Sequence, residues 1–265
     1  MLHKKSLGQH FLRSEGALKK IIEAAKLSSD DTVLEVGPGE GVLTKLLLQQ
    51  AGRVIAVEKD DRLIPELAIT FGKEIAAGKL ELIHADILKY ELGIRNYKKG
   101  YKVVANIPYY ITGALIRKFL ESEAQPSAMV LLLQKEVAKR IVGVTDTTSP
   151  RLRRAQKESI LSISVKAYGT PKYVDTVKAG AFSPPPNVDS GILAIEGISK
   201  KFFDGIEEKN FFKLLKKGFA HPRKLLSSNL GISPEELRKC GIAEKARPEN
   251  LSLQDWRALA RSYRT

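Results

Sequence analysis

The stretch that decides the fold is Asp31–Asp61, DTVLEVGPGEGVLTKLLLQQAGRVIAVEKDD. An apolar run, Thr32–Val36, is followed by a turn with three glycines, a helical pattern and a second apolar run, Val54–Val57, closed by Glu58. This order predicts a strand, a tight turn, a helix and a second strand. Such a turn lets backbone N–H groups and a helix N-terminus approach a ligand. An acid about 20 residues on suits ribose hydroxyls, so the stretch indicates a nucleotide site.

The spacing of the glycines narrows the choice of nucleotide. Gly37 and Gly39 belong to a G-x-G-x-G pattern, whereas a dinucleotide site has G-x-G-x-x-G. The pattern resembles the first motif of S-adenosylmethionine-dependent methyltransferases, with Glu35 two residues ahead of it. A cationic sulfonium needs no pyrophosphate cradle and tolerates a nearby acid. A nicotinamide dehydrogenase is disfavoured, and an ordinary turn between strand and helix remains the alternative on this stretch alone.

Composition and charge bound the class of protein. The 265 residues, 43% of them hydrophobic, allow one large domain with a small appendage. No apolar run reaches the ~18 residues of a membrane span. A single cysteine excludes an intrachain disulfide and favours the cytoplasm, and no Cys/His cluster has metal spacing. We therefore expect a monomeric cytoplasmic protein without a metal ion, a secretory signal or a membrane partner.

The net charge of +14 is concentrated in the second half of the chain. Residues 134–178 carry 10 basic and 4 acidic residues, and residues 200–265 carry 15 and 8. A near-neutral nucleotide domain with basic regions behind it favours a polyanionic partner such as nucleic acid, although a solvated lysine-rich surface gives the same count. The candidate RNA-binding residues are Lys135, Lys139, Arg140, Arg151, Arg153, Arg154, Lys216, Lys217, Arg223 and Lys224.

Periodicity along the chain predicts an α/β domain over residues 1–199 and a small all-α domain over residues 200–265. Ser14, Ser233 and Ser252 are expected to cap helices. A single helix is expected over residues 62–77, and another over residues 202–219. The expected strands are residues 32–36, 54–57, 80–84, 101–105, 128–133, 159–165 and 191–195.

Three later positions carry candidate chemistry. Asp86 follows the third expected strand, where a carboxylate can accept the exocyclic amine of adenine or merely cap a turn. The fourth strand runs into Asn106-Ile107-Pro108-Tyr109. The side-chain oxygen of Asn106 and the carbonyl of Ile107 can hold both hydrogens of an adenine amine and favour the attacking geometry. Tyr109 can stack on an extruded base, and Phe182 can cover the opposite face. The alternatives are a turn and core aromatics.

Taken together, these motifs resemble the ribosomal RNA adenine N6-dimethyltransferases, and most closely their small-subunit (16S) A family. The resemblance covers essentially the whole chain. Its ordered motifs are Leu7-Gly8-Gln9-His10-Phe11-Leu12, Glu35-Val36-Gly37-Pro38-Gly39-Glu40-Gly41, Asn106-Ile107-Pro108-Tyr109-Tyr110, Phe182–Ser190, and Phe219–Leu226 followed by Asn229-Leu230.

The resemblance implies a Rossmann-like class I S-adenosylmethionine-dependent methyltransferase sheet with a small C-terminal all-α domain. It implies four methyl transfers to two adjacent adenosines near the 3′ end of 16S rRNA in the small ribosomal subunit. His10 stands where the family commonly has Asn, and residues 143–158 lack the expected Tyr-Gly-Arg-Leu pattern. The implied cofactor contacts are His10, Leu12, Gly37, Glu58, Asp86, Ile87 and Asn106, to which the glycine turn adds Gly39.

Two rival functions remain at this point. A large-subunit rRNA adenine methyltransferase of the erythromycin-resistance type shares the cofactor and the chemistry, but residues 219–229 argue against it. A non-catalytic ribosome-assembly factor shares the fold and the basic surface. Intact Glu58, Asp86 and Asn106 argue against this second rival, because a pure binder does not need them.

Overall fold

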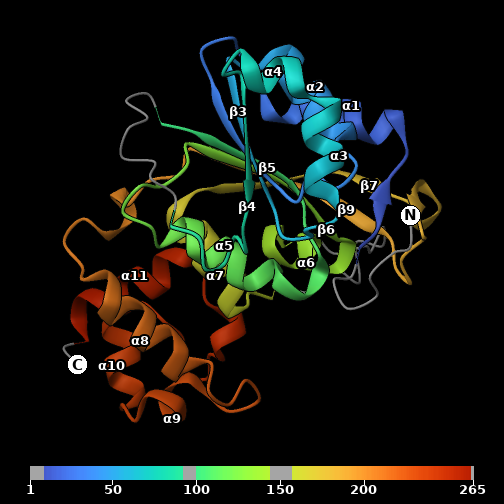
Figure 1. Ribbon diagram of the computed structural model, residues 1–265. Coiled ribbons are helices and arrows are strands. Elements are labelled where there is room, and N and C mark those ends of the chain that lie inside the picture. The colour runs from blue at the N-terminus through green and yellow to red at the C-terminus, as the bar shows by residue number, and fades with distance from the viewer. Residues whose placement is uncertain (1–8, 92–99, 144–156, 264–265) are drawn as a thin grey trace. The chain divides into compact units, whose positions relative to one another are not determined.

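The computed structural model describes residues 9–91, 100–143 and 157–263, which form two compact units (Figure 1). The first unit comprises residues 1–138 and 171–198, and the second comprises residues 139–170 and 199–265. The sequence predicted a single boundary after residue 199. The structure differs from this prediction because residues 139–170 group with the second unit. Arg151, Arg153 and Arg154 lie outside the described residues.

The first unit is built on a seven-stranded sheet in the order β4-β3-β2-β5-β6-β9-β7. The pairs among β4, β3, β2, β5 and β6 are all parallel, and β9 is antiparallel to β6. Parallel strands in this order bring the carboxyl ends of β2, β3, β4 and β5 to one edge, where open α/β sheets bind ligands. The strands are β2 Thr32–Val36, β3 Arg53–Glu58, β4 Leu80–His84, β5 Lys102–Asn106, β6 Ala128–Gln134, β7 Thr170–Val177 and β9 Ser190–Glu196.

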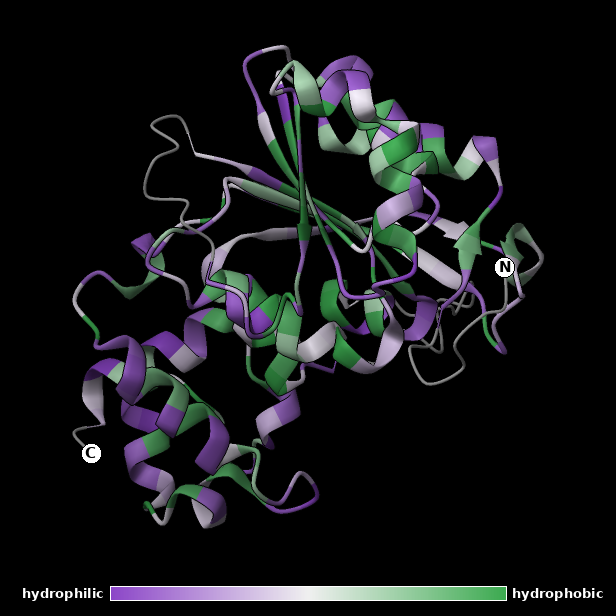
Figure 2. Ribbon diagram, viewed as in Figure 1, coloured by the Kyte–Doolittle hydropathy of each residue, from purple (hydrophilic) through white to green (hydrophobic). Residues whose placement is uncertain are grey.

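Helices cover both faces of this sheet (Figure 1). The helices α1 Glu15–Ala25, α2 Val42–Gln50, α3 Leu63–Thr70 and α4 Gly72–Ala76 lie on one side, and α5 Thr112–Leu120 lies on the other. The predicted cap of α1 is confirmed, because the Ser14 hydroxyl accepts a hydrogen bond from the backbone N–H of Ala17. Apolar residues gather on the strands and on the inner helix faces (Figure 2). Burial of these apolar faces supplies the main driving force for folding.

The prediction of a strand over residues 159–165 is wrong, because this segment begins helix α7, Ile160–Tyr168. Serines alternating with apolar residues gave the segment a strand-like period of two. Ser162 is in fact buried, and its hydroxyl bonds back to Ser159 in a capping box that starts the helix. Its polarity is therefore satisfied locally, and it does not mark a solvent-facing side.

Three further differences concern breaks in regular structure. The helix expected over residues 62–77 is interrupted at Phe71, where φ is −112° and ψ is 24°. The helix expected over residues 202–219 is a short 3-10 turn, η6 Lys201–Phe203, followed by α8 Glu208–Gly218. Strand β7 was not expected, since Pro171 and charged residues interrupt its apolar pattern. Its place at the edge of the sheet explains why proline is tolerated there.

The second unit is helical, as expected. Its fully buried Trp256 on α11 stacks on Phe219, with ring centroids 5.5 Å apart, and Phe211 and Leu215 of α8 are also buried. Both expected caps, at Ser233 and Ser252, are present, and each forms a capping box. No helix among the residues that the structure describes has the length and apolarity of a membrane span. Besides α7, η6 and α8, its elements are α9 Leu226–Leu230, α10 Pro234–Lys239, η7 Pro248–Asn250 and α11 Leu253–Ser262. Helix α6, Lys135–Val142, begins in the first unit and ends in the second.

The contact between α8 and α11 gives a stability prediction. A Cβ added at Gly218 would overlap the Trp256 ring and lie 3.1 Å from Leu226. We expect Gly218→Ala to destabilise the second unit by about 1–3 kcal/mol, as overpacking does. Trp256 is the single tryptophan, so its fluorescence during urea unfolding reports this unit. Lys213→Ala, at an exposed position on the same helix, is the control, and equal unfolding midpoints for both variants would contradict the packing.

Candidate active site

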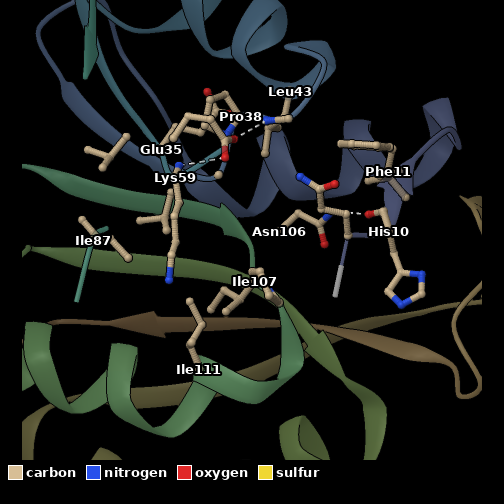
Figure 3. A pocket seen from close by; sticks show the side chains of 18 of the residues that line it. His10, Phe11, Glu35, Pro38, Leu43, Lys59, Ile87, Asn106, Ile107 and Ile111 are labelled. Carbon is tan, nitrogen blue, oxygen red and sulfur yellow. Dashed lines mark hydrogen bonds between the residues drawn. The ribbon is translucent and has the colours of Figure 1, made fainter. Parts of the chain in front are cut away.

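A pocket opens in the first unit beside the carboxyl ends of β2, β3 and β5 (Figure 3). Every residue that the sequence nominated for cofactor binding or catalysis lines this pocket. The arrangement brings together six segments that lie apart in the sequence. These lining residues are His10, Leu12, Gly37, Gly39, Glu58, Asp86, Ile87, Asn106, Ile107, Pro108, Tyr109 and Phe182.

The glycine turn depends on backbone angles that other residues rarely adopt. Gly37 and Gly39 have φ of 70° and 61°. The N–H of Gly37 donates to the carbonyl of Val57, 2.9 Å away, which anchors the turn to β3. A Cβ on Gly39 would lie 3.0 Å from the Phe11 ring, so the turn has no room for a side chain there. Helix α2 starts after this turn without a side-chain cap.

Glu58 ends β3 and accepts hydrogen bonds from three backbone N–H groups. Its Oε2 accepts from Gly39 at 3.1 Å, and its Oε1 accepts from Lys59 and Asp60 at 2.8 Å each. Burial raises the pKa of the Glu58 carboxyl, while these N–H donors lower it. The side chain therefore fixes the turn. Its Oε1 already accepts two hydrogen bonds, so the lone pair that remains for a further donor is on Oε2.

Glu35, inside β2, is a site residue whose properties the sequence did not reveal. It lines the pocket and is 1% exposed. Neither carboxyl oxygen has a hydrogen-bond partner among the described residues. Burial raises the pKa of Glu35 to about 8; nearby Thr44 opposes the shift and the Glu58 charge adds to it. Glu35 is thus protonated at neutral pH, and its position two residues before the first glycine was the only available signal.

The N-terminal segment closes one side of the pocket. Strand β1, Phe11–Leu12, pairs antiparallel with β8, Phe182–Ser183. The Nδ1–H of His10 donates to the carbonyl of Pro184 at 2.8 Å, and Gln9 donates to Asp60 at 2.7 Å. Phe182 is 5% exposed, so most of its ring packs into the core. Its proposed role against a base stays a prediction.

The Asn106 loop is held from two directions, and Figure 3 shows one of them, the hydrogen bond between Asn106 and His10. The Nδ2 of Asn106 donates to the backbone carbonyl of His10 at 3.0 Å, and its Oδ1, the acceptor end of the amide, has no partner among the described residues. The Tyr109 hydroxyl lies 2.8 Å from the hydroxyl of Ser190, the first residue of β9. The His10 and Tyr109 rings lie nearly parallel, 6.2 Å apart between centroids.

Asp86 follows β4 and is already paired. Its Oδ2 accepts from the Lys59 ammonium at 2.9 Å, and its Oδ1 accepts from the N–H of Leu88 at 3.0 Å. The Lys59 hydrogen bond is the main reason why the pKa of Asp86 is lowered. The sequence identified the carboxylate but not its cation, because Lys59 follows Glu58 without any distinctive pattern.

The predicted RNA-binding residues within the described chain differ in exposure. Lys139 is 9% exposed and presents little surface to a phosphate. Lys217 donates to the Tyr263 hydroxyl at 3.0 Å and lies over its ring. Lys135 is partly buried, whereas Arg140, Lys216, Lys217, Arg223 and Lys224 are exposed.

The sheet order, the glycine turn and an acid at the end of β3 define a class I S-adenosylmethionine-dependent methyltransferase. The family described as ribosomal RNA adenine dimethylase matches residues 1–264. The chain belongs to this family, as the sequence resemblance predicted.

Individual relatives agree with this assignment. The chain is similar to a ribosomal RNA small subunit methyltransferase A from Dehalococcoides mccartyi, with 44% identity over 98% of this chain and 88% of the relative. It is similar to one from Ligilactobacillus salivarius, with 36% identity over 96% and 87%. A dimethyladenosine transferase from Plasmodium falciparum has a TM-score of 0.74 and 28% identity over 94% and 96%. The 23S rRNA methyltransferase ErmE, with a TM-score of 0.72 and 24% identity over 95% and 98%, shares the fold.

The unpartnered Glu35 carboxyl makes stability depend on pH. In the folded chain it stays protonated up to about pH 8, whereas in the unfolded chain it ionises near its ordinary pKa of 4.5. The free energy of unfolding should therefore fall as the pH rises between these values, by at most about 1.4 kcal/mol per pH unit. Glu35→Gln should remove this contribution, so that variant and wild type diverge towards pH 8.

Urea unfolding followed by far-UV circular dichroism between pH 5.5 and 8.5 measures the divergence. Glu81→Gln, outside the pocket, is the control. Parallel pH dependences for Glu35→Gln and wild type would show that Glu35 ionises normally in the folded chain.

Proposed function

We propose that this protein transfers methyl groups from S-adenosylmethionine to the N6 of two adjacent adenosines near the 3′ end of 16S rRNA, in the small ribosomal subunit. Family membership supports the chemistry, and the similar small-subunit enzymes support this substrate. The observation that carries the proposal is the Asn106 side chain, whose nitrogen is tied to His10 while its oxygen stays available at the pocket.

The residues that line the pocket fit the proposed cofactor. S-adenosylmethionine supplies a methyl group activated on a sulfonium. The open space beside Gly37 leaves room for its methionine part. Glu58 has a lone pair on Oε2 suited to a ribose hydroxyl, and Asp86 has a lone pair on each oxygen suited to the adenine amine. Apolar walls at Ile87 and Ile107 suit the faces of the adenine ring.

The proposed target amine binds at the end of β5. Its nitrogen is a weak nucleophile because its lone pair is delocalised into the ring. The Asn106 oxygen and the Ile107 carbonyl accept its two hydrogens, which favours the pyramidal geometry and stabilises charge developing on nitrogen. Tyr109, held by Ser190, stacks on the base, with Phe182 at the edge of the same space. The amine loses its proton after transfer, so the site needs no strong general base.

A large-subunit target is less well supported. ErmE, at 24% identity, is similar in fold alone, whereas the small-subunit relatives reach 44%. We also propose that the protein acts as a monomer in the cytoplasm, where ribosomal subunits are assembled.

The first functional prediction concerns Asn106. Asn106→Ala removes an acceptor needed mainly as charge develops, so single-turnover methylation should slow by a factor on the order of 10²–10³. Binding to the subunit should change little, because the exposed basic residues are untouched. Methylation is measured with tritiated S-adenosylmethionine and saturating enzyme on small subunits, large subunits and naked rRNA, followed by mapping of the label. Binding is measured on the same variants in a separate subunit-binding assay.

Three outcomes distinguish the candidates. A near wild-type rate for Asn106→Ala would remove the catalytic role of this side chain. Label on the large subunit would favour the erythromycin-resistance type. Tight subunit binding by the wild type without any methyl transfer would favour an assembly factor.

The second functional prediction concerns the basic residues of the second unit. If Arg223 and Lys224 contact phosphates, subunit affinity should fall with salt, with a log–log slope of ~0.7 to 0.9 per contact. The double variant Arg223→Gln/Lys224→Gln should reduce that slope by about 1.4 to 1.8. Filter binding over 50–300 mM salt measures it, with Lys73→Gln on α4 as the control. An unchanged slope in the double variant would place the RNA elsewhere.

A further inference from the structure

Lys59 connects the two carboxylates proposed to hold the adenosine. Its backbone N–H donates to Glu58 Oε1 at 2.8 Å, and its ammonium donates to Asp86 Oδ2 at 2.9 Å. Glu58 ends β3 and Asp86 follows β4, so one residue joins the two neighbouring strand ends. The side chain reaches into the pocket, where its ammonium lies in view between Ile87 and Ile107 (Figure 3).

The ion pair fixes the direction of the Asp86 carboxylate. One oxygen accepts from Lys59 and the other from the Leu88 N–H, so rotation of the carboxylate would break two hydrogen bonds. Each oxygen still has a lone pair for another donor. The carboxylate is therefore oriented before an adenine amine arrives, which avoids the entropy loss of ordering it on binding.

The ion pair also lies where a bound ring would exclude water. The Asp86 side chain is 24% exposed and that of Lys59 is 51% exposed. An isolated carboxylate loses favourable hydration when a ligand covers it, and a paired carboxylate loses less. In the open pocket this exposed pair contributes little to stability, so its effect should appear in ligand binding.

We propose that Lys59 is a positioning residue for the adenine group of the cofactor, acting through the Asp86 carboxylate that it orients and neutralises. The inference rests on the proposed binding of S-adenosylmethionine, and it adds a residue that the sequence did not nominate. Lys59 also lines the pocket wall, so a side chain of similar length without charge separates the effect of the charge from the effect of the packing.

The test is a double-mutant cycle read by calorimetric binding of S-adenosylmethionine and S-adenosylhomocysteine at low and physiological salt. Lys59→Met keeps the length of the side chain and removes the charge, and Lys59→Arg keeps the charge. Asp86→Asn and the double variant Lys59→Met/Asp86→Asn complete the cycle. Lys45→Met removes an exposed lysine of α2 outside the pocket and controls for net charge.

We expect Lys59→Met to weaken binding of both ligands about fivefold to tenfold. The affinity of Lys59→Arg should stay within about threefold of that of wild type, and the affinity of Lys45→Met should equal that of wild type. Asp86→Asn should weaken binding by itself. In the Asp86→Asn background, Lys59→Met should change affinity less than about twofold, because no charge remains to neutralise.

Contrary outcomes separate this inference from the proposed function. If wild type binds and Lys59→Met binds equally well, Lys59 has no positioning role, while the proposed function stands. An equal loss in both backgrounds means that Lys59 acts without Asp86, and this also overturns the inference. If wild type binds neither ligand, both the proposed function and the inference about Lys59 are overturned.

Discussion

The active site depends on one buried carboxylate, Glu58, which gathers backbone N–H groups from two segments. It accepts from Gly39 in the turn after β2 and from Lys59 and Asp60 after β3. These N–H groups lie beyond the ends of the strands, where neighbouring strands no longer supply carbonyl acceptors, so a side chain must accept their hydrogen bonds. By doing so, Glu58 holds the glycine turn against the end of β3 and sets the floor of the pocket. The positions of α2 and of the residues after β4 follow from this arrangement.

A second feature of this region is that one buried acidic side chain has hydrogen-bond partners and another does not. Asp60 is buried with Arg62 and Gln9 as partners, and the Arg62 hydrogen bond holds its pKa far below the ordinary value. Glu35, on the neighbouring strand β2, has no hydrogen-bond partner among the described residues, and burial raises its pKa to about 8. The wall of the pocket therefore carries less negative charge than its acidic residues suggest, which matters for a ligand with a cationic centre.

Much of the fold could be predicted because local signals agreed with the final packing. The Gly37–Gly41 turn has no alternative with bulkier residues, and Ser14, Ser233 and Ser252 cap helices as their spacing indicates. The strand predicted over residues 159–165 was wrong because a buried serine gave this helical segment the alternating pattern of a strand. Strand β7 was missed because an edge strand needs no continuous apolar pattern. The residues of the pocket were predicted as a set. The pairing of Lys59 with Asp86 and the isolation of Glu35 were not, since both depend on neighbours brought together only by the fold.

The short pairing of β1 with β8 joins residues 11–12 to residues 182–183. One wall of the pocket is thus contributed by the beginning of the chain and completed by a segment about 170 positions later. During synthesis on a ribosome, the strands β2 to β6 can emerge and pair while this wall is still missing. This wall, which His10, Leu12 and Phe182 line, is therefore completed only after residues 182–183 have been translated.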